Sequence, residues 1–239
     1  MKRIILIVLR NLYRIPYGWV RLCKYARNPD RYSEEQRYSL IREIAKWIVL
    51  GGKINLEVYG EEHIPQENGF MIFPNHQGLF DGFAIARACK TPFSTIYKKE
   101  LRGVPFVKQI FACVKAISLD REDVRQGLQV INQVASEVKE GRNFVIFAEG
   151  TRSKNGNQLS DFKGGSFKSA TKAKCPIMPV ALINSYQVFD THSAKRVTVQ
   201  VHFIKPISYA EYKDMKGVEI ASMVKGGIEK TIKSNIKEL

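Results

Sequence analysis

The sequence predicts an α/β fold: a single domain with a central mixed, mostly parallel sheet flanked by helices. Apolar, strand-like runs alternate along the chain with amphipathic helical segments, and several of these runs are continuously apolar, as in strands buried on both faces. The length of 239 residues is enough for one large domain with its own hydrophobic core. No segment is rich enough in Pro, Gly or Ser to divide the body in two.

A helix is predicted to begin at Ser33, which forms a capping box with Gln36, and to end at Gly51-Gly52. The sequence leaves open whether this helix packs on an earlier helix, enters lipid or covers the core. Beyond it, strands are expected at residues 54–58, 70–73, 94–97, 116–119, 144–147, 177–183 and 197–203, and helices at 81–89, 123–139 and 218–236.

Two of these elements carry a predicted environment. The strand over 197–203 alternates apolar and polar residues, which indicates an edge strand. The helix over 123–139 is predicted to be amphipathic, with one apolar face made of Val124, Leu128, Ile131, Val134, Ala135 and Val138.

The charge of the chain indicates an anionic partner. Lys and Arg number 38 against 23 Asp and Glu, a net charge of +15, which suits nucleic acid, lipid headgroups or an acidic protein. Cys23, Cys89, Cys113 and Cys175 form no CxxC pair, which argues against a disulfide framework or a structural zinc site and favours a reducing compartment. No apolar run approaches the ~20 residues that cross a bilayer, which excludes a polytopic membrane protein.

Residues 1–52 are predicted to form a basic, amphipathic helical element for membrane association, ahead of a domain over 53–239. Residues 1–31 hold eight cations interleaved with apolar and aromatic side chains, and Asp30 is their only acid. This mixture is typical of a helix in the membrane interface, although a terminal helix packed on the domain is the alternative. We favour a monotopic or peripheral protein at the cytoplasmic face of a membrane, and because no cleavage site follows residues 4–9, we expect the segment to be retained.

A His and an Asp follow the predicted strand over 70–73. In an open α/β sheet, ligands bind beyond the carboxyl ends of the strands. If His76 lies in the turn after the strand and Asp81 opens the next helix, the carboxylate reaches the imidazole, fixes its tautomer and raises the basicity of the other nitrogen. Such a pair is a candidate general base. The alternative is a capping Asp beside an ordinary surface His.

Two more strands end in polar segments. After the strand over 144–147, Gly150 lets a ligand approach the backbone, Thr151 offers a hydroxyl, and Arg152 can hold a phosphate through two hydrogen bonds. The phosphate loop of nucleotide-binding proteins is absent. Arg121 follows the strand over 116–119 and is expected to face the same crevice. Each segment alone is also compatible with a hydrated turn.

Taken together and in this order, these segments resemble the glycerolipid acyltransferase family, whose best known members are lysophosphatidic acid acyltransferases. The resemblance covers about half the chain. Its four motifs are similar to Asn75-His76 with Asp81; to Lys98–Leu101, Pro105-Phe106 and Asp120-Arg121; to Phe147–Ser153 with Ala148 in place of Pro; and to Pro176–Val180. Lys108 and Lys115 stand where the family often has glycines, and Gly78 stands where Ser is common.

The resemblance implies an enzyme that moves a fatty acyl group from an acyl thioester to the 2-hydroxyl of lysophosphatidic acid, giving phosphatidic acid. His76, oriented by Asp81, would be the general base, and backbone N–H groups around Gly78 would steady the tetrahedral oxyanion. Because the motif contains no nucleophilic Ser or Cys, direct transfer is expected. The implied acceptor site, in which the cations hold the phosphate and the other residues shape the pocket, comprises Lys98, Arg121, Glu149, Gly150, Thr151 and Arg152.

The implied partners are a membrane lipid surface, a lysophospholipid acceptor, and an acyl carrier protein or coenzyme A thioester as co-substrate. No metal is expected, because His76 and Asp81 are too few ligands, and no other cofactor is implied. Alternative functions are transfer to another lysolipid, such as lysophosphatidylglycerol or lyso-ornithine lipid, and hydrolysis by the same pair. A nucleic-acid-binding protein would suit the charge, but no helix-turn-helix, RNA-recognition or zinc-finger pattern is present.

Overall fold

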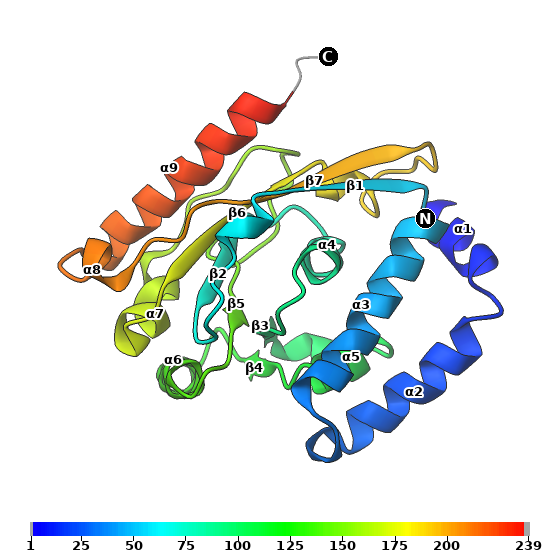
Figure 1. The fold of residues 1–239 in the computed structure, drawn as a ribbon, viewed down its shortest axis with the longest axis horizontal. Coiled ribbons are helices and arrows are strands. Elements are labelled where there is room, and N and C mark those ends of the chain that lie inside the picture. The colour runs from blue at the N-terminus through cyan, green and yellow to red at the C-terminus, as the bar shows by residue number, and fades with distance from the viewer. Residues whose placement is uncertain (1, 237–239) are drawn as a thin grey trace.

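A computed structural model describes residues 2–236, and its centre is a seven-stranded sheet in the order β1-β7-β6-β2-β5-β3-β4 (Figure 1). The strands are β1 Ile54–Tyr59, β2 Met71–Pro74, β3 Ser94–Lys98, β4 Ile117–Leu119, β5 Phe144–Val145, β6 Ile177–Ile183 and β7 Val197–Phe203. The neighbouring strands β6, β2, β5, β3 and β4 all run parallel. Strand β7 pairs antiparallel with β6 and parallel with β1, which confirms the predicted mixed, mostly parallel sheet.

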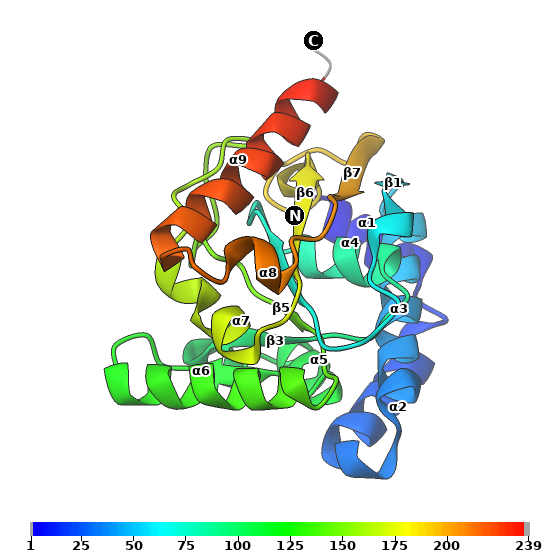
Figure 2. The same cartoon turned by 60° about the vertical axis from the view of Figure 1, so that its left-hand side comes forward.

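Helices cover both faces of the sheet (Figures 1 and 2). One group comprises α1 Lys2–Arg10, α2 Ile15–Arg27, α3 Glu34–Gly51, α4 Asp81–Ala88 and α5 Val107–Cys113, and the other α6 Val124–Lys139, α7 Lys168–Ala173, α8 Tyr209–Tyr212 and α9 Gly217–Asn235. Short 3-10 helices lie at η1 Pro29–Arg31, η2 Glu61–His63, η3 Lys99–Gly103, η4 Gly164–Phe167 and η5 Ser185–Gln187. Each face of the sheet therefore has its own apolar cluster of buried side chains.

Helix α3 belongs to the core, which settles the question that the sequence left open. It begins with the predicted capping box, in which Ser33 and Gln36 exchange hydrogen bonds between side chain and backbone. Its buried side chains include Leu40, Ile44 and Ile48, and they join the same apolar cluster as side chains of β1, β6 and β7. Packing rather than intrinsic propensity therefore holds this helix in place.

The N-terminal helices are tied to the end of α3. The guanidinium of Arg3 is buried and donates to the carbonyl oxygen of Gly52 at 2.7 Å. The amide of Asn11 donates to the carbonyl oxygen of Trp47 at 3.1 Å. The bond from Arg3 satisfies the carbonyl of the C-cap residue Gly52, and Asn11 adds a second donor to a carbonyl near the end of α3. Within residues 2–236, no helix combines the length and the apolar character needed to span a membrane.

One predicted environment, that of β7, is wrong, and the predicted apolar face of α6 is buried only in part. Strand β7 lies between β1 and β6, so β1 and β4 form the edges of the sheet. The alternation in β7 arises because one of its faces is only partly covered, not because the strand lacks a neighbour. Helix α6 buries Val130 and Val134, whereas Val124 is 85% and Leu128 57% exposed. An amphipathic pattern identifies the apolar side of a helix but not how far along that side the sheet extends.

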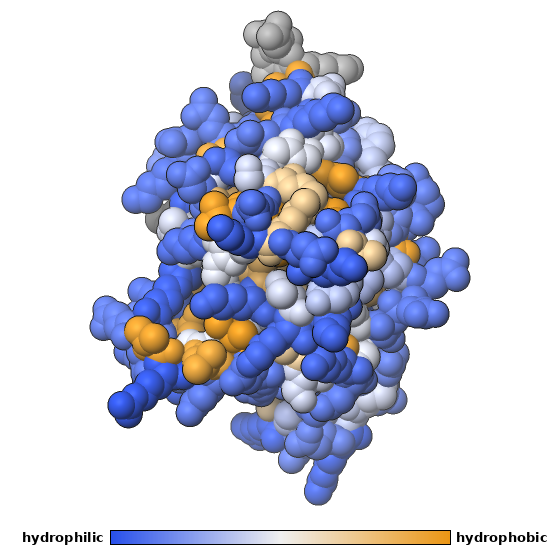
Figure 3. Space-filling view, turned by 90° about the vertical axis from the view of Figure 1, so that its left-hand side faces the viewer, coloured by the Kyte–Doolittle hydropathy of each residue, from blue (hydrophilic) through white to orange (hydrophobic). Residues whose placement is uncertain are grey.

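The face that carries α7, α8 and α9 is covered mainly by hydrophilic side chains, with apolar side chains in small groups (Figure 3).

The backbones of Gly164 in η4 and Gly217 at the start of α9 lie in close contact. A Cβ atom on Gly217 would lie 2.7 Å from the carbonyl oxygen of Gly164, so only glycine allows this approach.

We therefore expect Gly217→Ala to lower the free energy of unfolding by about 1–3 kcal/mol, because the added methyl group forces α9 away from η4. The matched control is Gly226→Ala, at an exposed position of the same helix where a Cβ atom meets nothing within 4 Å. This control should raise stability by up to about 1 kcal/mol through helix propensity. Urea unfolding measures both changes, and effects of equal sign and size would contradict the close contact.

Candidate active site

The predicted polar segments meet at one edge of the sheet, because five neighbouring strands run parallel and end there. In spatial order, Asn184-Ser185 follows β6, Asn75-His76 follows β2, Glu149–Arg152 follows β5, Lys98 ends β3, and Asp120-Arg121 follows β4. The candidate active site lies at this end of the sheet, beyond the carboxyl ends of the five parallel strands. We call it the catalytic edge.

His76 and Asp81 form the predicted pair. Asp81 is the first residue of α4, and its Oδ2 accepts the hydrogen bond of His76 Nδ1 at 2.8 Å. The same oxygen accepts the backbone N–H groups of Gln77 at 2.6 Å and Gly78 at 2.9 Å, and Oδ1 accepts the Ser185 hydroxyl at 2.5 Å. The carboxylate is fully buried. Through these four hydrogen bonds it caps the turn and fixes the orientation of the imidazole.

The imidazole of His76 leaves one nitrogen for a ligand. Its ring lies against that of Phe147, with the ring centroids 4.1 Å apart. Nδ1 is bound to Asp81, and no group within residues 2–236 forms a hydrogen bond with Nε2. The side chain is 23% exposed, so Nε2 is the atom at which the site can exchange a proton with a substrate.

The segment after β5 holds the backbone of His76 on both sides. The carboxylate of Glu149 accepts the N–H of His76 at 2.6 Å and the N–H of Ser160 at 2.9 Å. The N–H of Ser153 donates to the carbonyl oxygen of His76 at 2.8 Å. Burial raises the pKa of the Glu149 carboxyl, while the hydrogen bonds from the N–H groups of His76 and Ser160 oppose the rise. Because both of its oxygens are bonded to backbone, Glu149 is a positioning residue for His76.

The other predicted acceptor residues lie on the exposed rim of this edge. Gly150 has a φ of +72°, a conformation that favours glycine, and Thr151 beside it is exposed. A guanidinium nitrogen of Arg152 lies 3.3 Å from Oδ1 of Asp190. Lys98 forms an exposed ion pair with Glu100 at 2.8 Å.

Arg121 is exposed and forms no ion pair within the described residues. The structure places it just after β4, two strands away from β5, so it lies at the same end of the sheet as Arg152 without contacting it.

The contribution of β6 to the site was not predicted from the sequence. The amide of Asn75 bonds the backbone N–H and C=O of Leu182 at 2.7 and 3.0 Å and so extends the pairing of β2 with β6. Ser185, three residues after Leu182, donates its hydroxyl to the carboxylate of Asp81. The polar pair Asn184-Ser185 directly after a buried strand was the available signal, the same signal that identified the other three segments.

One predicted role is wrong for two of the groups expected to fill it. The oxyanion was expected to be steadied by backbone N–H groups around Gly78, but those of Gly78 and Gln77 are donated to Asp81. These groups build the His-Asp pair and are not available to a substrate oxygen. Within residues 2–236, no group of three His, Cys, Asp or Glu side chains is placed to hold a metal ion.

Comparisons with known proteins define the class of enzyme. A family model described as Acyltransferase matches residues 55–183, which is more than half of the chain and includes His76, Asp81 and Arg152. The chain therefore belongs to the acyltransferase family.

Curated relatives are more specific. The 1-acyl-sn-glycerol-3-phosphate acyltransferase of Borreliella burgdorferi is 30% identical over 71% of this chain and 68% of its own length. That of Saccharomyces cerevisiae is 30% identical over 75% of this chain and 60% of its own. Among solved structures, the 1-acyl-sn-glycerophosphate acyltransferase PlsC from Thermotoga maritima matches with a TM-score of 0.77 over all of both chains, at 20% identity. This match shows a shared fold.

Glu149→Gln tests the link between the two segments. The substitution places an amide NH₂ against one of the two backbone N–H groups, which costs about 1–3 kcal/mol of stability and loosens His76. We expect kcat to fall about tenfold or more, with a smaller change in the acceptor KM. Urea unfolding and initial rates measure the two effects. Glu62→Gln, at an exposed position, is the matched control, and a variant with wild-type kcat would show that Glu149 does not position His76.

Proposed function

We propose that this enzyme is a 1-acyl-sn-glycerol-3-phosphate acyltransferase that transfers a fatty acyl group from an acyl thioester to the 2-hydroxyl of lysophosphatidic acid, giving phosphatidic acid. The observation that carries the proposal is an imidazole whose Nδ1 is bound by the buried Asp81 carboxylate, while Nε2 has no hydrogen-bond partner among the described residues 2–236. The 1-acyl-sn-glycerol-3-phosphate acyltransferase activity for which the curated relatives are named supports the same reaction. Lysophosphatidylglycerol and lyso-ornithine lipid are the alternative acceptors.

In the proposed reaction, Nε2 of His76 takes the proton of the acceptor hydroxyl while that oxygen attacks the thioester carbonyl. The tetrahedral intermediate then loses its C–S bond, and the imidazolium returns the proton to the departing thiolate. Asp81 stabilises the imidazolium formed between the two steps. The products are the new ester and a free thiol, of an acyl carrier protein or coenzyme A.

Direct transfer is favoured because two serine hydroxyls beside the His76 loop are already donated to other groups, and two buried thiols, which lie away from this loop, are unsuited to attack. The hydroxyl of Ser185 is donated to Asp81, and that of Ser153 to the carbonyl oxygen of Gln158 at 2.6 Å. Burial raises the pKa of the Cys89 thiol to about 11 and that of Cys175 to about 12, so neither forms a thiolate near neutral pH.

The acceptor phosphate is assigned to the cations along the same edge. Arg152 follows β5, beside the strand that carries His76, and Lys98 and Arg121 extend the row across β3 and β4. Guanidinium groups bind phosphate through paired hydrogen bonds, so Arg152 is the central contact. An acyl carrier protein or coenzyme A is also anionic and would be attracted by the net charge of +15.

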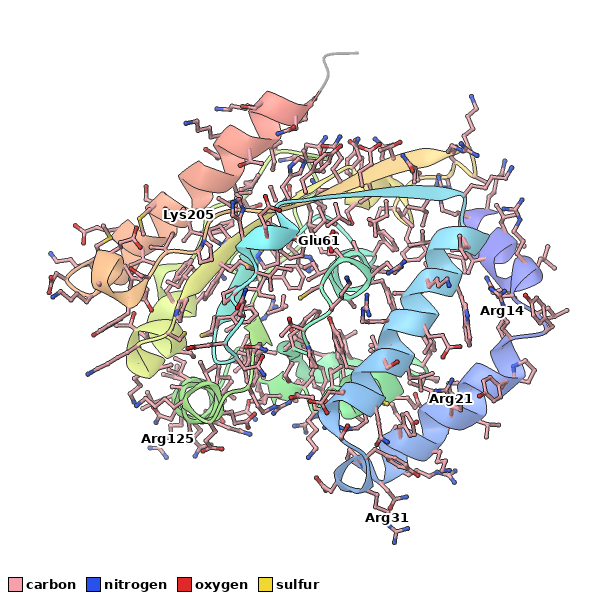
Figure 4. All side chains as sticks on the ribbon, in the orientation of Figure 1. Arg14, Arg21, Arg31, Glu61, Arg125 and Lys205 are labelled. Atoms are coloured by element: carbon pink, nitrogen blue, oxygen red, sulfur yellow. The ribbon has the colours of Figure 1, made fainter. Side chains whose placement is uncertain are left out.

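Membrane attachment is assigned to the outer sides of α1 and α2, as a monotopic or peripheral association at the cytoplasmic face. Large apolar side chains there are exposed, including Leu9 at 64% and Val20 at 65%. Arg14 and Arg31 lie near the two ends of α2 with Arg21 between them (Figure 4). Exposed apolar groups flanked by cations favour binding to an anionic lipid surface.

His76→Ala is the central test of the catalytic proposal. Loss of the base should lower kcat for transfer to lysophosphatidic acid by about 10²–10⁴-fold without unfolding the protein. The matched control is His192→Ala, at an exposed histidine after η5. Initial rates with acyl carrier protein and coenzyme A thioesters, each offered several lysolipids, identify both substrates. Near-normal turnover by His76→Ala would refute the mechanism, and acceptor-independent release of fatty acid would indicate a hydrolase instead.

Val20→Glu tests the membrane surface. A carboxylate at this exposed position of α2 removes apolar contact and repels anionic headgroups, so partition onto anionic vesicles should fall about tenfold or more. Val218→Glu, at a position of α9 that is 74% exposed, makes the same change on another helix and should leave partition unchanged. Vesicle flotation measures both variants. Equal loss in the two would show that net charge, and not α2, determines binding.

A further inference from the structure

A carboxylate that the sequence analysis did not identify lies between Arg152 and the loop of the general base. Asp190 follows η5, and its backbone N–H donates to the carbonyl oxygen of Tyr186 at 3.1 Å, which anchors the residue beyond β6. Its Oδ1 lies 3.3 Å from a guanidinium nitrogen of Arg152. Its Oδ2 lies over Gly78, where a Cβ atom on Gly78 would be only 2.4 Å from that oxygen.

These contacts explain why a glycine suits position 78 in this chain. The carboxylate of Asp190 occupies the space that a side chain at position 78 would fill, two residues after His76. A negative charge therefore lies on the side of Arg152 that faces the catalytic loop. An acceptor phosphate that reaches Arg152 from this side must take the place of the carboxylate.

The pair with Arg152 is weak enough to be replaced. It is made through one guanidinium nitrogen, and the side chains of Arg152 and Asp190 are 45% and 38% exposed. Single exposed ion pairs of this kind contribute little to stability. A phosphate monoester carries more charge than a carboxylate and can bond two guanidinium nitrogens at once, so it is the stronger partner.

Resting on the proposed function, we propose that Asp190 competes with the acceptor phosphate for Arg152 and thereby sets the acceptor KM. In the free enzyme the carboxylate holds the guanidinium beside the catalytic loop. In the complex the phosphate replaces it, and the carboxylate moves towards solvent. Asp190 thus lowers the affinity for the acceptor by acting through Arg152, and it takes no part in the chemical step.

The test is a double-mutant cycle of Asp190→Asn and Arg152→Ala, with initial rates of transfer to lysophosphatidic acid. Asp190→Asn should lower the acceptor KM about two- to fivefold, because the competing charge is gone, and should change kcat by less than about twofold. Arg152→Ala should raise the acceptor KM, and adding Asp190→Asn to it should change nothing further. Asp214→Asn, at an exposed acid after α8, controls for net charge.

A KM that rises or stays constant in Asp190→Asn overturns the proposal, as does an equal effect in the Arg152→Ala background. A rise would mean that Asp190 holds Arg152 in its binding position. Titration calorimetry with inorganic phosphate tests the competition without turnover: Asp190→Asn should bind phosphate about two- to fivefold more tightly than the wild type. If the wild type does not acylate lysophosphatidic acid, the proposed function fails, while equal phosphate affinities overturn the role of Asp190 alone.

Discussion

The site depends on one buried carboxylate that accepts four hydrogen bonds. Asp81 binds the imidazole of His76, two backbone N–H groups of the intervening turn, and the hydroxyl of Ser185. A buried acceptor with four donors has one stable arrangement, because moving any donor away leaves a polar group unpaired. The turn, the start of α4 and the end of β6 are therefore fixed relative to one another by a single side chain.

The carboxylates of Asp81 and Glu149 hold different parts of His76. Asp81 holds the ring of His76, whereas Glu149, together with the N–H of Ser153, holds its backbone. The strands that carry these residues are neighbours in the order β6-β2-β5. Glu149 therefore helps to position the imidazole of His76, although the two residues are more than 70 positions apart in the sequence. Such coupling is a property of the parallel sheet, which brings the ends of its strands together.

Much of this arrangement follows from local sequence. The fold class, the cap of α3 at Ser33 and the contact of His76 with Asp81 all depend on residues close together in the chain. What the sequence could not supply is sheet order: β7 reads as an edge strand until β1 is found beside it. The same limit hid Ser185 and Asp190, whose partners Asp81 and Arg152 lie in segments that follow other strands. The bond from the Gly78 N–H to Asp81 spans only three residues, but its acceptor was assigned to the imidazole alone.

The attachment of α1 to the end of α3 has a mechanical consequence. The bonds from Arg3 to Gly52 and from Asn11 to Trp47 attach the N-terminal helices to α3, the helix that packs against the sheet. Those helices therefore cannot swing independently of the catalytic edge. If α1 and α2 bind a membrane as proposed, they hold His76 at a fixed height above the lipid surface, so the acceptor hydroxyl has to travel a fixed distance out of the lipid to reach it.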